Sequence, residues 1–169
     1  MQCISKGKEH KKYEFGNKVS IICSATGIIL GAISFRNEYD GHTIEASLEQ
    51  VVERLTKRKI KILAGDRGYR GKKEINGTKI LIPDTPKNQR LKKHKLFRKR
   101  AGIEPTIGHL KSDYRLGRNF YKGVTGNAMN ILLAAAAYNF QRAMKALWNF
   151  IKKVSEISST DDISLKWAF

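Results

Sequence analysis

Two apolar runs near the N-terminus are separated by a short break. The first covers residues 13–24 and mixes β-branched with aromatic residues, and the second, IILGAISF, begins at Ile28 after the segment Ala-Thr-Gly. Residues of these types favour strands, and a glycine-containing break favours a reversal of the chain. The pattern predicts a β-hairpin.

The apolar positions that follow recur at helical spacing. They are Ile44, Leu48, Val51, Val52 and Leu55. Asp40 and Thr43 are both suitable capping residues, because their side-chain oxygens accept hydrogen bonds from the first backbone N–H groups of a helix. We expect a helix of about four turns here.

The middle of the chain contains two short β-type runs. Residues 60–65 end at Asp66 and a glycine-rich turn over residues 67–71, and residues 79–82 stop at Pro83. Proline cannot donate a hydrogen bond to a sheet, so it favours the end of a strand. We expect Asp66 at the C-terminal end of a strand.

Helical spacing returns in the C-terminal half. It runs through Ile103, Ile107, Leu110 and Tyr114, and then over residues 127–154, before a polar tail at residues 155–169. The element order predicts an α/β domain over residues 1–154, with a parallel strand pair and a mixed sheet covered by helices on both faces.

The amino-acid composition also indicates which class of molecule the protein binds. Thirty-three Lys and Arg against fifteen Asp and Glu give a net charge of +18, which favours association with nucleic acid. Two cysteines without a metal-binding spacing fit a reduced, cytoplasmic protein. The N-terminus lacks the apolar run of a signal peptide, and residues 131–137 are too few to span a bilayer, so no membrane association is expected.

Two acidic residues have settings suited to chemistry. Asp66 follows a strand, where α/β sheets bind ligands, although an Asp before Arg-Gly is also a common turn former. Glu104 lies near a helix start, with Arg100 four residues before it and Lys111 seven after it, spacings that share a helix face. Pro105 allows a separate segment for Arg100, and a helix-start glutamate stabilised by the macrodipole is the alternative for Glu104.

Together these segments resemble the motifs of a known enzyme family. DRGYRG at residues 66–71 is similar to the second-acid motif of DDE-type insertion-sequence transposases. The third-acid motif of that family resembles F-x2-R-x3-E-x6-K at Phe97, Arg100, Glu104 and Lys111, where the family usually begins with Tyr. Two further segments are similar to the insertion-sequence-five group in particular: IEPTIGHLKSDYRLGRNFYKG and, after it, NILLAAAAYNFQR. The resemblance covers roughly residues 3–147.

The resemblance implies a ribonuclease-H-like fold and a metal-dependent activity. In this family three carboxylates hold two divalent ions, normally Mg²⁺, which cleave DNA strands and transfer them at insertion-sequence ends. Asp66 and Glu104 would be two of the metal ligands. The implied DNA-binding residues are Arg67, Arg70, Arg100 and Lys111.

The family's remaining acid lies on the first strand, upstream of a stretch resembling residues 3–20. We therefore expect this chain to miss the first strand and its Asp, and to be a truncated, inactive fragment. Asp40, in a loop or cap, and Glu14, facing outward on a strand, are poor substitutes. His109 lies about 140° around the helix from Glu104, and no nucleophilic triad is visible.

Two other functions remain open. A non-catalytic DNA-binding regulator derived from a transposase would keep the basic surface, including the run RLKKHKLFRKR at residues 90–100, without cutting DNA. A ribosomal or other structural RNA-binding protein explains the charge but not the two motifs. The expected partners are DNA, and either a second copy or a missing N-terminal part, in the nucleoid of a bacterial cytoplasm.

Overall fold

The computed structural model describes residues 2–8, 11–36, 38, 40–54, 60–69, 73–82 and 99–166. Two antiparallel hairpins come first along the chain. Strand β1 (Gln2–Lys8) pairs with β2 (Lys11–Gly16), and β3 (Lys18–Cys23) pairs with β4 (Ile29–Phe35). The second pair is the hairpin that the sequence predicts. The predicted first strand is divided at Asn17, so that its beginning belongs to β2 instead.

The turn of the β3–β4 hairpin is fixed by its own polar groups. The hydroxyl of Ser24 accepts a hydrogen bond from the backbone N–H of Ile28 at 3.0 Å, and the Ser24 carbonyl accepts one from Gly27 at 3.0 Å. Gly27 has φ +82°, a left-handed conformation that glycine adopts without steric cost. Local chemistry therefore explains why the chain reverses at the Ala-Thr-Gly break.

Helix α1 (Asp40–Arg54) covers one face of this hairpin. Its apolar stripe of Ile44, Leu48 and Val51 packs in one core cluster with Ile22 of β3. At Gly31 of β4 an added Cβ would lie 2.5 Å from the Val51 side chain, so the absence of a side chain allows the close approach of helix and strand. The predicted helix is confirmed, and Asp40 is its first residue.

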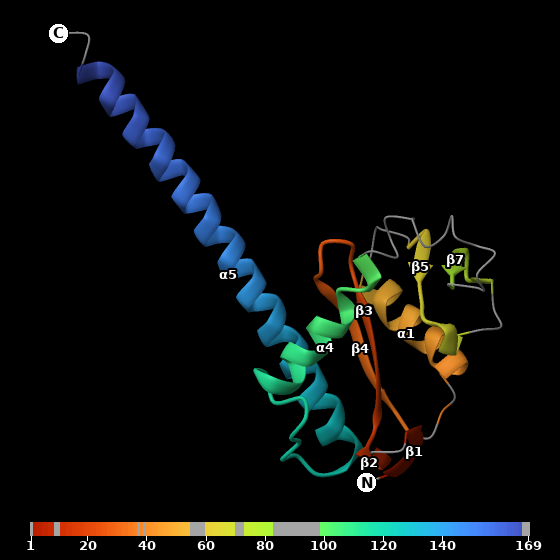
Figure 1. The fold of residues 1–169 in the computed structure, drawn as a ribbon. Helices are drawn as coiled ribbons and strands as arrows, with labels where there is room; N and C mark the ends of the chain where they lie inside the picture. Colours follow the sequence, from red (N-terminus) through yellow and green to blue (C-terminus); the bar gives the residue numbers. More distant parts are fainter. Residues whose placement is uncertain are drawn as a thin grey trace.

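The opposite face is covered by α5 (Gly123–Lys166), and Figure 1 shows the hairpin between the two helices. Ile131, Ala134 and Tyr138 form a second core cluster with Ile29 of β4 and Leu110 of α4 (Ile103–Ser112). The expectation of helices on both faces is confirmed for this hairpin.

Strand β4 and helix α5 are also tied by a side-chain amide. Asn139 accepts a hydrogen bond from the Ile29 N–H at 2.9 Å and donates one to the Ile29 carbonyl at 2.8 Å. Because β4 is an edge of its two-stranded sheet, this amide satisfies backbone groups that a neighbouring strand would otherwise pair. The contact fixes the register between strand and helix.

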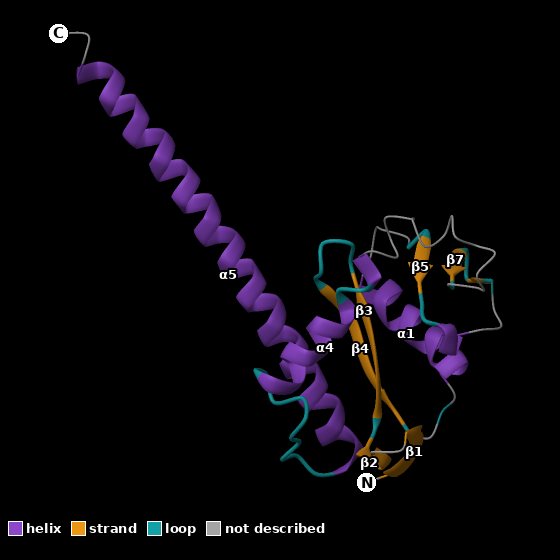
Figure 2. Cartoon of the chain, viewed as in Figure 1, coloured by secondary structure: helices purple, strands orange, loops and turns teal. Residues whose placement is uncertain are grey.

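A third sheet has the order β5–β7–β6, with β5 (Ile62–Ala64), β6 (Glu74–Ile75) and β7 (Thr78–Leu81). Strands β5 and β7 are parallel, and β6 is antiparallel to β7. A parallel pair was expected somewhere in the sheet, but from the strand–helix–strand order, and β5 and β7 both follow α1. Neither β1 nor the two-residue β6 was predicted. One mixed sheet was expected, whereas the described residues form three small sheets, coloured orange in Figure 2.

Helix α5 is longer than predicted at both ends. The sequence suggested a helix over residues 127–154 and an unassigned polar tail after it, but the helix continues to Lys166. The segment SEISSTDD is polar, yet no Gly or Pro follows Gly126, and Ser, Thr and Asp only weaken a helix.

Among the described residues, no helix is long and apolar enough to cross a membrane.

Candidate functional site

Asp66 lies just beyond the C-terminal end of β5. The N–H of Gly65 donates to the Leu81 carbonyl at 2.9 Å, which extends the parallel β5–β7 pairing up to Asp66. The Asp66 carbonyl accepts a hydrogen bond from the Tyr69 N–H at 3.1 Å, so Asp66 also begins the single turn of 3₁₀ helix η1 (Arg67–Tyr69). Asp66 therefore follows a strand, as predicted, and also begins a turn, and its side chain is 61% exposed.

The Asp66 carboxylate forms an ion pair with Arg100. Arg100 Nη2 lies 3.0 Å from Asp66 Oδ2, and the arginine side chain is only 25% exposed. Residues 99 and 100 are helical, but a turn at Ala101 and Gly102 separates them from α4. Arg100 thus belongs to a separate segment, one of the two arrangements that Pro105 allowed. The ion pair joins the two sequence motifs in space.

Glu104 lies in the first turn of α4 and Lys111 in the last, and both side chains are exposed. The opposite side of α4 is anchored, because Leu110 is fully buried and the Thr106 hydroxyl lies 3.2 Å from the Tyr138 hydroxyl. Thr106 also donates to the Gly102 carbonyl at 2.9 Å. The anchor presents Glu104 and Lys111 on a surface beside the segment that holds Arg100.

Basic side chains continue from this surface into the loop after α4. The exposed lysines and arginines of α4 and of this loop are Lys111, Arg115, Arg118 and Lys122. Arg115 has φ +57°, and its carbonyl accepts a hydrogen bond from the Arg118 N–H at 3.0 Å. Both arginines therefore lie in one tight turn. We call Arg100, Lys111, Arg115, Arg118 and Lys122 the basic surface. The sequence analysis singled out only its first two members.

Asp113, at the end of α4, forms an exposed pair with His109. Asp113 accepts hydrogen bonds from Ser112 and His109, which together lower the pKa of its carboxyl group. His109 Nδ1 lies 2.8 Å from Asp113 Oδ2. His109 is therefore engaged with Asp113, consistent with the prediction that it does not share the face of Glu104.

The described residues do not by themselves form a metal site. Among them, no group of three or more His, Cys, Asp or Glu side chains is arranged to hold an ion. Asp66 is paired with a guanidinium, and Glu104 lies on a different element. Asp66 and Glu104 each carry the hard oxygen donors that Mg²⁺ prefers.

The structure does not describe several of the predicted site residues, or describes only their backbone. The side chain of Arg67, all of Arg70 and the basic run up to residue 98, with Phe97, lie outside the described residues. The same holds for the side chains of Asp40, at the start of α1, and Glu14, in β2. Their predicted roles stay predictions.

Neither cysteine forms a disulfide. Burial raises the pKa of the Cys23 thiol to about 11, against a smaller opposite effect of Arg142. The thiol is therefore protonated at neutral pH and is a poor nucleophile or metal ligand.

Comparison with known proteins gives one match. The sequence profile of the family described as Transposase DDE domain matches residues 3–140, a span that includes Asp66, Arg100 and all of α4. No curated protein matches the chain, and no solved structure matches it. Proteins of this family carry out DNA transposition, bind DNA and generally use divalent metal ions. Since the match covers most of its length, the chain belongs to the transposase DDE-domain family.

Proposed function

We propose that this protein acts in the transposition of a member of the insertion-sequence-five group and binds the element ends with its basic surface. The observation that carries the proposal is the Asp66–Arg100 ion pair, because it joins the two motifs on which the assignment depends. The segment from Ile103 to Gly123, which is similar in sequence to that group, forms α4 and the basic loop after it. The motifs therefore occupy one region of the surface.

Within this site we assign Asp66 and Glu104 as two of the three carboxylates of the family. Arg100 and Lys111, together with Arg67 and Arg70, are assigned to phosphates of the DNA. An arginine guanidinium binds phosphate through paired, charge-assisted hydrogen bonds. Phosphate and the Asp66 carboxylate then compete for Arg100, so that DNA binding releases Asp66 from its ion pair. This exchange keeps a mostly buried guanidinium satisfied in both states.

Electrostatics supplies most of the expected affinity. The five side chains of the basic surface alone, if each neutralises one phosphate, would give log Kd a slope against log salt of about 4–5, and contacts of Arg67 and Arg70 would add to it. Positioning by phosphates carries no sequence information, so we expect binding that is strong at low salt and largely independent of sequence.

Catalysis needs a third carboxylate. The assignment identifies two, and the described residues contain no cluster of three acidic or other ligand side chains. We therefore infer that this chain, without a partner that supplies a third carboxylate, binds DNA without nicking or joining it. A regulator that occupies element ends is the second candidate function, and the same observation favours it.

DNA binding by the basic surface is tested by fluorescence anisotropy with a labelled duplex at rising salt. Lys111→Ala, within the surface, is compared with Lys145→Ala, which removes the same charge from exposed α5. We expect several-fold weaker binding for the first variant and a small change for the second. Equal losses, or an affinity that does not fall with salt, would contradict the proposal.

A further inference from the structure

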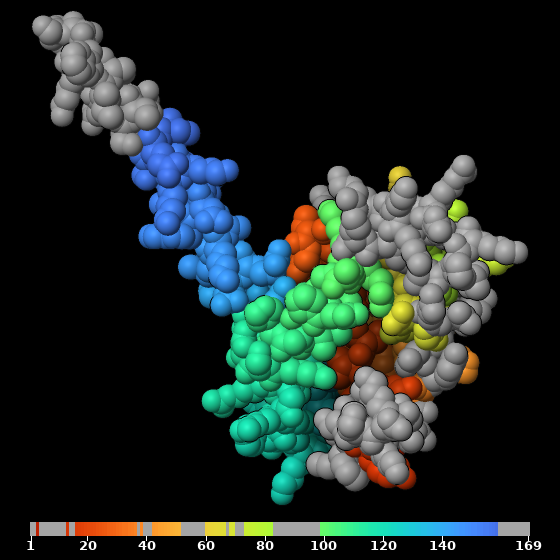
Figure 3. Space-filling view, viewed as in Figure 1, coloured from red at the N-terminus to blue at the C-terminus, as the bar shows by residue number. Residues whose placement is uncertain are grey.

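The loop between α4 and α5 combines cations with an exposed aromatic ring. Phe120 is 76% exposed, more than any other large apolar side chain of the described residues. Arg118 and Lys122, both exposed members of the basic surface, lie two residues before it and two residues after it. In Figure 3 the teal side chains of this part of the chain stand out from the body. A single exposed apolar residue is common on protein surfaces, so the surroundings of this ring decide its significance.

Packing and hydrogen bonds fix the loop on both sides of Phe120. On one side, Leu116 packs against the core cluster that joins α4 to α5. On the other side, the Tyr121 N–H donates to the side-chain carbonyl of Asn119 at 2.9 Å, and the Asn119 amide donates to the Asn127 side chain of α5. The loop therefore holds Phe120 at a defined place on the surface.

Tyr121, the next residue, is held against α5. Its Cβ would lie 2.6 Å from a Cβ added at Gly126, a buried position in the first turn of that helix, so the contact requires glycine. The Tyr121 side chain is 50% exposed, against 76% for Phe120. Of these two neighbouring aromatic residues, Phe120 therefore offers the freer ring.

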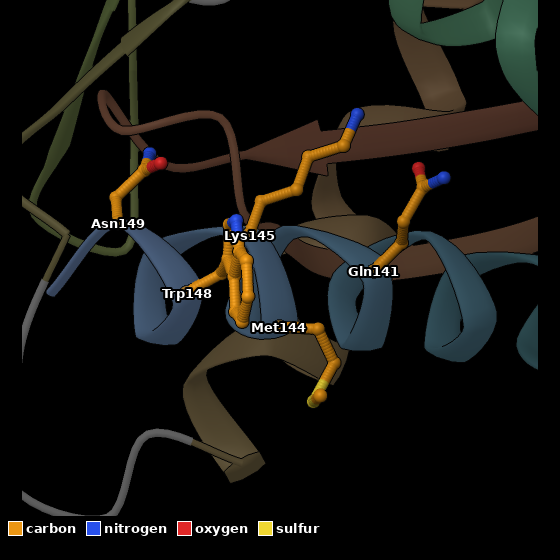
Figure 4. Close-up of a pocket in the computed structure, with 5 residues that line it drawn as sticks. All are labelled: Gln141, Met144, Lys145, Trp148 and Asn149. Atoms are coloured by element: carbon orange, nitrogen blue, oxygen red, sulfur yellow. The ribbon is translucent and has the colours of Figure 1, made fainter. Parts of the chain in front are cut away.

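Trp148 of α5 shows that exposure beside a cation does not by itself leave a ring free. It is 59% exposed, but the Nζ atom of Lys152, on the same helix, lies over its ring at 5.6 Å from the centroid. Figure 4 shows Trp148 with Met144 and Lys145 in a pocket lined by residues of α5. One face of the Trp148 ring is thus already covered, and this ring lies outside the basic surface.

We propose that Phe120 stacks on an unpaired base of the DNA that the basic surface binds, an inference that rests on the proposed function. Aromatic rings among basic side chains bind single-stranded nucleic acid, because the cations contact phosphates while the ring covers the face of a base. In an intact duplex the neighbouring bases cover both faces, so the ligand needs a base outside the stack. The preferred substrate is DNA with an unpaired base, either in a single-stranded tail or turned out of a duplex.

The position of the loop gives Phe120 a role in holding the DNA strand. Glu104 and the loop lie at opposite ends of α4, which has ten residues and is therefore about 15 Å long. At 3.4 Å per nucleotide along a duplex, this length corresponds to about four nucleotides. The stacked base is thus several nucleotides from the assigned carboxylates, and Phe120 is a positioning residue that does not touch the reacting phosphate.

The test measures binding of the full chain to three labelled DNAs with equal numbers of phosphates. They are a fully paired duplex, a duplex with a single-stranded tail and a duplex with one unpaired internal base. We expect at least one of the last two to bind about fivefold or more tightly than the paired duplex in fluorescence anisotropy, the effect expected of one base stacked on an aromatic ring. Preference for the tail identifies a single-stranded end, and preference for the internal base identifies a base turned out of the duplex.

Three substitutions separate stacking from other effects of the side chain. Phe120→Leu keeps an apolar side chain without a ring, so it should abolish the preference and leave binding of the paired duplex unchanged. Phe120→Tyr keeps a ring and should retain the preference. Tyr13→Leu is the matched control, because Tyr13 is a 59% exposed aromatic residue of β2 outside the basic surface; it should bind like the unmodified chain.

The outcomes distinguish this inference from the proposed function. Equal binding of the three DNAs by the unmodified chain, or a preference that survives Phe120→Leu, overturns the inference. Either result leaves the proposed function standing if the paired duplex still binds with an affinity that falls as salt rises. Absence of binding to all three DNAs would contradict both.

Discussion

The Asp66–Arg100 ion pair predicts that removing an acid strengthens DNA binding. Asp66→Asn deletes the carboxylate that holds Arg100 and leaves the guanidinium available to a phosphate. Two unit charges 3.0 Å apart attract by about 1.4 kcal/mol in water. Because Asp66 is 61% exposed, solvent screening and side-chain entropy reduce this to about 0.2–1 kcal/mol. The gain in DNA affinity is therefore at most roughly fivefold.

Arg100→Ala has the opposite effect. A hydrogen bond to a charged group contributes about 1.5–3 kcal/mol, and subtracting the ion pair that DNA must break leaves about 1–2 kcal/mol. This corresponds to roughly 5- to 30-fold weaker binding. Opposite signs at the two paired residues are expected if DNA and Asp66 compete for the same guanidinium, and a control at a second carboxylate separates this competition from an effect of net charge.

The assay is duplex binding by fluorescence anisotropy at one fixed pH, without divalent ions. Asp113→Asn is the matched control, since it removes a similarly exposed carboxylate that pairs with His109 instead of with an arginine. Equal gains from the Asp66 and Asp113 substitutions would show that net charge alone matters. An Arg100→Ala protein that binds like the unmodified chain would refute the competition.

Other parts of the structure are open to simple tests. Leu110→Ala should lower the free energy of unfolding by about 2–5 kcal/mol in urea titration, because this fully buried leucine joins α4 to α5; no loss would contradict the anchor. Cys3 should react with iodoacetamide well before Cys23 at neutral pH, since burial raises the pKa of Cys23 to about 11; equal rates would count against that burial. The chain alone should not nick supercoiled plasmid with Mg²⁺ or Mn²⁺, and cutting that is lost in Asp66→Ala would show an internal third ligand.

Local patterns in the sequence predicted the elements that carry the site. A glycine-containing turn fixed the β3–β4 hairpin, and helical spacing located α1 and the start of α4. Asp66 was placed correctly because strand and turn chemistry both act over a few residues. The hairpin turn and the turn at Asp66 depend on hydrogen bonds between residues close in the sequence, and each helix depends on one apolar face.

Long-range features could not be predicted in this way. The Asp66–Arg100 pair joins residues far apart in the sequence, and no local pattern indicates their contact. The sequence placed Arg100 near Glu104 and, through the family resemblance, at a phosphate of the DNA. The division into three sheets depends on which strands pair with each other, and the alternation of apolar and polar residues along a strand does not specify its partner. The length of α5 was underestimated because a polar segment was taken as a helix end although it contains no Gly or Pro.

The Asp66 turn, Arg100 and α4 are proposed to form one DNA-binding site, and a crystal structure of the chain with a duplex of the element end would show whether they do. We expect a phosphate within hydrogen-bonding distance of Arg100. The Asp66 and Glu104 carboxylates should lie within about 10 Å of each other, as a shared two-ion site requires. DNA bound away from Arg100, with the two carboxylates on opposite faces of the protein, would contradict the proposal.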